Sequence, residues 1–106
     1  MSPEDRQKLY DEVVEKDSAV AFLRALYDHC ETPEEVLAAK VVDGLAYTPR
    51  NKKPTKNYPE FACVRWPWGD AHGVLYAGGR SYWEARLRLR DKLVASARDL
   101  VKEAKS

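Results

Sequence analysis

The stretch from Phe61 to Ala77, FACVRWPWGDAHGVLYA, decides the fold. Its two ends, residues 61–66 and 73–77, contain the aromatic and β-branched residues that are typical of strands. Residues 67–72 between them include proline, glycine and aspartate, which favour turns and loops. The stretch therefore predicts two strands that are joined by a loop and pair as a hairpin.

A long helix is expected directly after the hairpin. Gly78 and Gly79 should break the chain, and Ser81 is a suitable N-cap for a helix from about Tyr82 to Lys102. The apolar residues of this segment fall on one side of a helix, so that side should pack on the hairpin. They are Tyr82, Trp83, Leu87, Leu89, Leu93, Val94, Ala97, Leu100 and Val101.

The first 44 residues predict two or three amphipathic helices, because apolar residues recur at spacings of three to four. The helix-start signals are Ser2 followed by Pro3, Asp17 or Ser18, and the capping box formed by Thr32 and Glu35. Gly44 should end the last of these helices. Residues 45–47 are a candidate third strand at the edge of the sheet.

Length and composition fit one α+β domain spanning residues 1–106. The chain has 106 residues, of which 44% are hydrophobic and 33% charged, which excludes disordered and collagen-like chains. We expect an acidic helical part (residues 1–44) and a basic part (residues 45–106) that holds a small antiparallel sheet of two or three strands and a long C-terminal helix packed on that sheet.

The sequence predicts neither a membrane span nor a secretion signal. No apolar run approaches the roughly 20 residues that a membrane-spanning helix requires. Residues 1–5 also lack a basic segment followed by an apolar one. We therefore expect a cytoplasmic protein with no membrane partner.

Charge is divided unevenly along the chain, although the net charge is only +1. Residues 1–46 carry 5 basic and 11 acidic side chains, whereas residues 47–106 carry 13 basic and 6 acidic ones. Two explanations are open. The basic half could provide a surface for nucleic acid, or the two halves could attract each other within one fold.

A basic loop is the first candidate site. Residues 48–58 contain two prolines and no apolar period, and they carry Arg50, Lys52, Lys53 and Lys56. Together with Arg80, at the start of the last helix, these cations are candidate phosphate contacts for RNA or DNA. The alternative is an ordinary solvated surface.

The hairpin loop is the second candidate site, because Trp66, Trp68 and His72 crowd a position that is usually polar. Exposed tryptophans are typical of protein interfaces and of surfaces that stack on unpaired bases. The alternative is that one or both tryptophans fold back over the helices as part of the core.

Arg86 and Arg90 form a third candidate site, because they fall near the centre of the apolar side of the last helix. An isolated buried charge costs several kcal/mol, so both guanidinium groups need partners or access to water. They predict either an anion site or buried ion pairs.

An enzyme with a Cys/His site is a further alternative. His29 and Cys30 are adjacent, and His72 lies in the hairpin loop, within reach of Cys63 in principle. No catalytic or metal-binding motif accompanies them, and the two cysteines form no CxxC pair. We expect two reduced core thiols, no enzymatic activity, no metal and no cofactor.

The order of elements from Pro33 onward resembles that of double-stranded-RNA-binding domains. The resemblance covers about 70 residues and includes Pro59-Glu60-Phe61, Gly78-Gly79-Arg80-Ser81, Ala85 and Leu89. In that family a lysine pair after the glycine turn holds phosphates. Tyr82 and Trp83 occupy this position here, so only Arg80 could take that role. The same order is similar to HicB-type antitoxins, which bind a protein toxin.

These observations favour a non-catalytic binding protein that engages nucleic acid through the basic loop and the start of the C-terminal helix. The alternative is a protein-binding inhibitor, antitoxin or assembly factor that uses the aromatic hairpin. A small enzyme with a Cys/His site is the third hypothesis.

Overall fold

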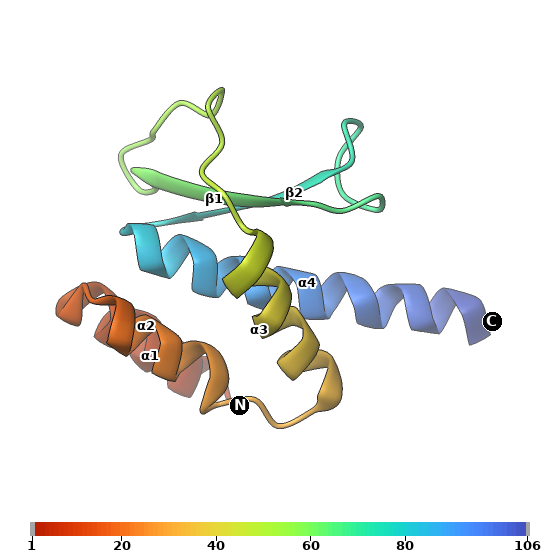
Figure 1. The fold of residues 1–106 in the computed structure, drawn as a ribbon, viewed down its shortest axis with the longest axis horizontal. Helices are drawn as coiled ribbons and strands as arrows, with labels where there is room; N and C mark the ends of the chain where they lie inside the picture. Colours follow the sequence, from red (N-terminus) through yellow and green to blue (C-terminus); the bar gives the residue numbers. More distant parts are fainter. Residues whose placement is uncertain (1, 106) are drawn as a thin grey trace.

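The computed structural model describes residues 2–105 and confirms the α+β class (Figure 1). The long C-terminal helix lies between the hairpin on one side and the first two helices on the other, and the third helix crosses it. The elements are α1 (Pro3–Lys16), α2 (Ala19–Tyr27), α3 (Pro33–Leu45), β1 (Glu60–Arg65), β2 (Val74–Gly79) and α4 (Tyr82–Lys105).

The predicted N-caps of the first three helices are confirmed. The hydroxyl oxygens of Ser2, Ser18 and Thr32 each accept a hydrogen bond from the backbone N–H three residues later. Asp17 ends α1 in the left-handed conformation, with φ of 43°, so that the cap of α2 follows at once. The prediction for Gly44 is wrong, because α3 continues through this residue and its C-cap is Ala46.

The sheet contains two strands, whereas two or three were expected. β1 and β2 pair antiparallel, with Ala62 opposite Ala77 on the face toward α4 and Cys63 opposite Tyr76 on the other face, which we call the outer face. The candidate third strand is reduced to a single bridge, in which the backbone of Tyr47 exchanges two hydrogen bonds with Cys63. It cannot extend, because Leu45 still belongs to α3 and Pro49 has no N–H to donate.

Gly78 and Gly79 do not break the chain but form the end of β2. A Cβ on Gly79 would lie 2.4 Å from the backbone nitrogen of Ala85, in the first turn of α4. A Cβ on Gly78 would lie 2.9 Å from the ring of Tyr58. These glycines are therefore needed for close packing of the strand against its neighbours.

The core lies around α4, which contacts all the other helices and strands. Leu26, Leu87 and Leu89 are fully buried at its centre, and Ala62, Val64 and Ala77 contribute the inner face of the hairpin.

Among the described residues, none of the helices combines the length and the apolar character that crossing a bilayer requires.

An ion-pair cluster joins the start of α4 to α1. The carboxylate of Glu84 is fully buried and accepts hydrogen bonds from the backbone N–H of Arg80 at 2.8 Å and from its Nε at 2.9 Å. The same guanidinium donates to Asp11 of α1 at 2.7 Å. The acidic and basic halves of the chain thus attract each other within the fold, as one of the two explanations of the charge division predicted.

The buried carboxylate should make the protein sensitive to acid. Burial raises the pKa of Glu84, but the hydrogen bonds from Arg80 and the charge of Arg88 lower it by more, so the pKa lies below the ordinary value of 4.5. A carboxylate whose pKa is lowered by folding stabilises the protein above its ordinary pKa, and this stabilisation is lost as the pH falls through the folded value. The free energy of unfolding should therefore decrease as the pH is lowered from 5 to 3.

The variant Glu84→Gln tests this assignment by urea denaturation followed by circular dichroism. Its free energy of unfolding should be lower than that of the wild type at pH 7 and should change less between pH 5 and 3. Glu15→Gln, on the exposed side of α1, should follow the wild-type curve. An undiminished acid dependence in Glu84→Gln would assign the effect to other carboxylates.

Candidate nucleic-acid interface

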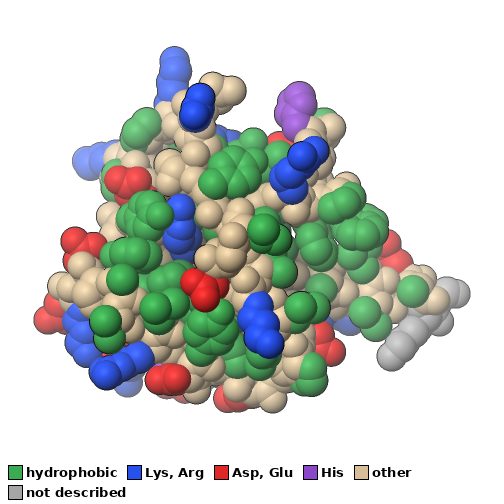
Figure 2. Space-filling model, viewed as in Figure 1, with side chains coloured by type: hydrophobic (Ala, Val, Ile, Leu, Met, Phe, Trp, Pro, Cys, Tyr) green, Lys and Arg blue, Asp and Glu red, His purple; other side chains and the backbone are tan. Residues whose placement is uncertain are grey.

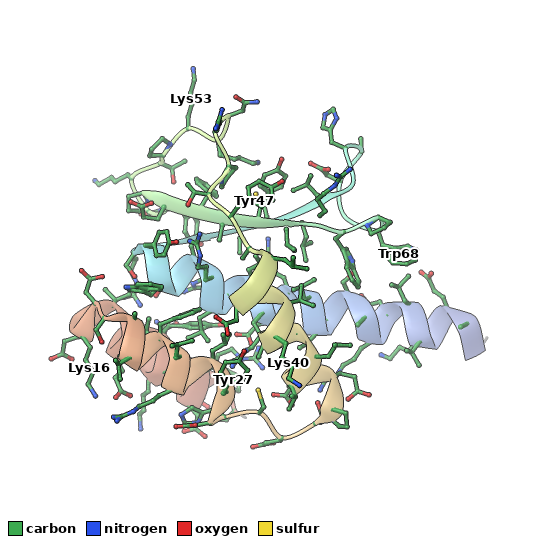
Figure 3. All side chains as sticks on the ribbon, in the orientation of Figure 1. Lys16, Tyr27, Lys40, Tyr47, Lys53 and Trp68 are labelled. Atoms are coloured by element: carbon green, nitrogen blue, oxygen red, sulfur yellow. The ribbon has the colours of Figure 1, made fainter. Side chains whose placement is uncertain are left out.

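The basic loop, residues 48–58, covers part of the outer face of the hairpin. A turn holds its second half, in which the N–H of Thr55 donates to the carbonyl of Tyr58 at 3.1 Å. Its first half is held by Lys52, whose ammonium lies 4.5 Å from the centre of the Tyr76 ring. In Figure 3, Lys53 points away from the molecule at the top, on the side opposite Lys16 and Lys40.

The positive charge of the basic loop is not neutralised locally. Residues 48–58 contain no acidic residue, and all four cations, Arg50, Lys52, Lys53 and Lys56, are exposed. Within residues 2–105 these four side chains form no ion pair. Lys and Arg side chains project along the top of the molecule in Figure 2, the side on which this loop lies.

A pocket of about 450 Å³, which we call the loop pocket, lies between the basic loop and the outer face of the sheet. It combines two tyrosine rings with two cations and two small polar side chains, and its lining contains no carboxylate. The residues that line it are Tyr47, Thr48, Pro49, Arg50, Asn51, Lys52, Cys63 and Tyr76. Phosphate and aromatic groups both find suitable partners in this lining.

Arg86 lies beside the loop pocket as a buried guanidinium without a carboxylate partner among the described residues. It is 6% exposed and stacks on the ring of Tyr82, with its Cζ 3.6 Å from the ring centre. Its Nη2 lies 3.4 Å from the hydroxyl oxygen of Thr48, a residue of the pocket lining. Burial lowers the pKa of Arg86, although a guanidinium stays charged at neutral pH.

Arg90 is separate from this site and is a structural residue. It is 2% exposed, and its Nη1 donates to the carbonyls of Ala25 and Leu26 at 3.0 and 2.9 Å, at the end of α2. Its Nη2 donates to Asp91 Oδ1 at 3.0 Å. Of the two predicted alternatives, Arg90 fits the buried ion pair.

Arg80 is bound by carboxylates on both sides. Its side chain is 43% exposed, but Glu84 and Asp11 already accept hydrogen bonds from it. Both interactions raise the pKa of this guanidinium, so it is stabilised as a cation in the ion-pair cluster. The structure therefore leaves fewer of its donors for a phosphate than the exposed loop cations have.

The hairpin loop lies at the other end of the hairpin from the basic loop (Figure 3). Trp66 is half-buried against the core, and its indole N–H donates to the hydroxyl of Ser96 at 2.8 Å. Trp68 is 60% exposed and lies edge-on to Trp66, with ring centres 5.3 Å apart. His72 is exposed, and its backbone N–H donates to Asp70. Trp66 thus folds back on the helices, whereas Trp68 stays available to a partner.

Neither thiol has the lowered pKa of a reactive cysteine. Burial raises the pKa of Cys63, which is 1% exposed, and of Cys30, whose Sγ donates to the carbonyl of Leu26. A nucleophilic cysteine needs the opposite shift. Nowhere in residues 2–105 do three or more His, Cys, Asp or Glu side chains gather as metal ligands.

Sequence reasoning found the loop cations but missed the aromatic side of the loop pocket. Tyr47 and Tyr76 become neighbours only because both pair with Cys63, one through the single bridge and the other in the hairpin register. The alternation along β2 could have placed Tyr76 on the outer face. Nothing in the sequence indicated that the loop would fold over that face.

No protein family, curated protein or solved structure matches the chain. The resemblance to double-stranded-RNA-binding domains and to HicB-type antitoxins stays a prediction from the order of elements.

Proposed function

We propose that this is a non-catalytic nucleic-acid-binding protein. The basic loop contacts phosphates, and the loop pocket receives a nucleotide of a single-stranded segment. The observation that carries the proposal is the set of four exposed loop cations without ion pairs, beside a pocket lined by two tyrosine rings. Arg80 stabilises the start of α4 and is not a main contact to phosphate.

The chemistry of single strands supports this assignment. Binding without sequence preference combines a positively charged track for the backbone with aromatic rings on which bases stack. The loop supplies the charge, and Tyr47, which is 44% exposed, and Tyr76 supply the rings. Arg86 adds a further positive charge behind Thr48.

The proposal predicts a steep dependence of affinity on salt. Four phosphate contacts to a single strand give a slope of roughly −3 in log affinity against log salt, so affinity should fall about fifty-fold between 50 and 200 mM salt. In the variant Arg50→Gln/Lys52→Gln/Lys53→Gln/Lys56→Gln this dependence should nearly vanish. Fluorescence anisotropy of a labelled single-stranded oligonucleotide measures both curves.

A matched control removes four cations from the opposite side of the protein. Lys8→Gln/Lys16→Gln/Arg24→Gln/Lys40→Gln changes the net charge by the same amount but leaves the basic loop intact. It should keep the wild-type slope. Equal losses in the two variants would mean that overall charge, and not this loop, attracts the nucleic acid.

A second candidate function, binding of another protein, is favoured by an apolar patch at the hairpin loop. Trp68 is 60% exposed and lies against Trp66, and Leu37, which is 64% exposed, lines a small apolar pocket together with Trp66 and with residues of α4. Exposed tryptophans of this kind dominate the affinity of many interfaces.

The variant Trp68→Ala separates the two functions. It should leave oligonucleotide affinity within about twofold of the wild type, since Trp68 lies at the other end of the hairpin from the basic loop. A loss of oligonucleotide binding in Trp68→Ala would place this tryptophan in the nucleic-acid interface. Wild-type protein that binds no oligonucleotide at 50 mM salt would leave protein binding as the remaining candidate.

A further inference from the structure

A second pocket, which we call the edge pocket, lies where α1, α4 and the outer edge of β2 meet. Its volume is about 470 Å³, which is within the range of small-molecule sites. Arg6, Arg88 and Lys92 line one side together with Asp91, and the rings of Tyr58 and Phe61 line another. The pocket thus combines three cations and one carboxylate with aromatic surface.

The negative charge of Asp91, the carboxylate in the edge pocket, is neutralised by the buried guanidinium of Arg90. Asp91 Oδ1 accepts two hydrogen bonds from the buried guanidinium of Arg90, at 3.2 and 3.0 Å. Its Oδ2 accepts a short hydrogen bond from the hydroxyl of Tyr10. Burial and this hydrogen bond raise the pKa of Tyr10, so its hydroxyl stays protonated as a donor. Asp91 therefore offers little charge to the three cations in front of it.

The cations of the edge pocket retain free donors. Arg88 stacks on the ring of Tyr10, with its Cζ 4.3 Å from the ring centre, and its buried Nε makes no hydrogen bond within the described chain. Its Nε lies 3.3 Å from Glu84 Oε1, so Arg88 shares this carboxylate with Arg80 as an ion pair. Arg6 Nε lies 3.8 Å from Asp91, which is too far for a hydrogen bond. Lys92 uses one proton on the carbonyl of Tyr76, at 2.7 Å.

The balance of charge around the pocket is positive. Arg80 and Arg88 both pair with Glu84, Arg80 pairs also with Asp11, and Arg90 pairs with Asp91. These three carboxylates balance Arg80, Arg88 and Arg90, so the charges of Arg6 and Lys92 remain in excess at the pocket. Guanidinium groups present several donors in a plane that matches the oxygens of a phosphate. A phosphate monoester carries about two negative charges at neutral pH, which match this excess.

We propose that the edge pocket binds the phosphate monoester of a nucleotide. Arg6, Arg88 and Lys92 hold the phosphate, and Tyr58 and Phe61 lie beside the attached sugar or base. This site does not rest on the function proposed for the basic loop, because its cations belong to α1 and α4. The phosphate can come from a free mononucleotide or from the terminal phosphate of a nucleic-acid strand.

The first test is a titration of the protein with AMP, adenosine and inorganic phosphate, followed by heteronuclear NMR. AMP should bind at least about tenfold more tightly than adenosine, and the shifted amide signals should include Ala77, Gly78 and Arg88. The variant Arg6→Gln/Lys92→Gln, in which both replaced side chains are exposed, should lose about tenfold or more in AMP affinity. The matched control Lys8→Gln/Lys102→Gln, on the same two helices, should bind AMP as the wild type does.

The second arm distinguishes the two sources of phosphate. An oligonucleotide with a 5′-phosphate is compared with the same oligonucleotide ending in a 5′-hydroxyl. A preference for the phosphorylated strand that disappears in Arg6→Gln/Lys92→Gln would identify the strand end as the ligand. AMP binding without such a preference would identify a free nucleotide.

Three results would overturn the proposal. They are no binding of AMP or phosphate at millimolar concentration, equal affinity for AMP and adenosine, and AMP affinity that is unchanged in Arg6→Gln/Lys92→Gln. Failure of the basic loop to bind oligonucleotides would leave the proposal standing, provided that AMP still binds at Ala77 and Gly78.

Discussion

Replacement of Arg90 by methionine is expected to lower the free energy of unfolding by about 3–5 kcal/mol, the usual cost of removing one partner of a buried ion pair. Arg90 is almost fully buried and is hydrogen-bonded to two carbonyls of α2 and to Asp91. In the Arg90→Met variant these acceptors lose their partner while remaining away from water. Since small domains are stable by only about 5–15 kcal/mol, the variant should be close to the limit of folding.

Urea denaturation of Arg90→Met measures this loss, and Arg98→Met is its control. Arg98 is 55% exposed and lies 3.9 Å from Glu35, so its loss should cost no more than about 1 kcal/mol. The double variant Arg90→Met/Asp91→Asn should recover part of the lost stability, because it removes the unpaired carboxylate. A cost below 1 kcal/mol for Arg90→Met would contradict the structural role of this residue.

The second large effect is expected at Gly79. Gly79→Ala should lower the free energy of unfolding by about 3 kcal/mol, the upper end of the usual cost of overpacking. The added Cβ would lie 2.4 Å from the nitrogen and 2.8 Å from the Cα of Ala85. Both are backbone atoms, so the first turn of α4 must move away from β2 and disturb the ion pairs of Glu84.

Gly44→Ala provides the matched control, with the opposite sign. Gly44 lies within α3, and an added Cβ there would meet no atom within 4 Å. Alanine in a helix is more stable than glycine by about 0.5–1 kcal/mol, so this variant should be more stable than the wild type. Thermal unfolding of both variants tests the pair, and two changes of the same sign would contradict this explanation.

The helix starts and the hairpin could be predicted from sequence because their causes are local. Ser2, Ser18 and Thr32 cap helices through N–H groups only three residues away. The strands follow from two apolar stretches on either side of a short loop. The order of elements, and the packing of the last helix on the sheet, followed from these local signals.

The roles of the glycines could not be predicted from the local sequence. Gly44 was expected to end a helix, and Gly78 and Gly79 were expected to break the chain. Their actual roles depend on how the elements pack, since Gly44 faces open space whereas Gly78 lies against Tyr58 and Gly79 against Ala85. A glycine signals that a side chain is absent, but the sequence does not show which neighbour requires that absence.

The candidate sites were predicted as residue types rather than as arrangements. The loop cations were recognised because they lie close together in a segment without acids. The partners of Arg80 and Arg90 could not be predicted, because Asp11 and the carbonyls of α2 lie more than 60 residues away. The edge pocket could not be predicted for the same reason, as its cations come from the two ends of the chain.

The central position of α4 also has a consequence for synthesis of the chain. α4 follows all the other described elements in the sequence, and yet it contacts each of them. During translation, at about 5–20 residues per second, the first three helices and the hairpin leave the ribosome seconds before the helix that buries their apolar sides. A nascent chain that ends before Tyr82 lacks Leu87 and Leu89, so we expect it to stay unfolded and to expose those surfaces to chaperones until α4 emerges.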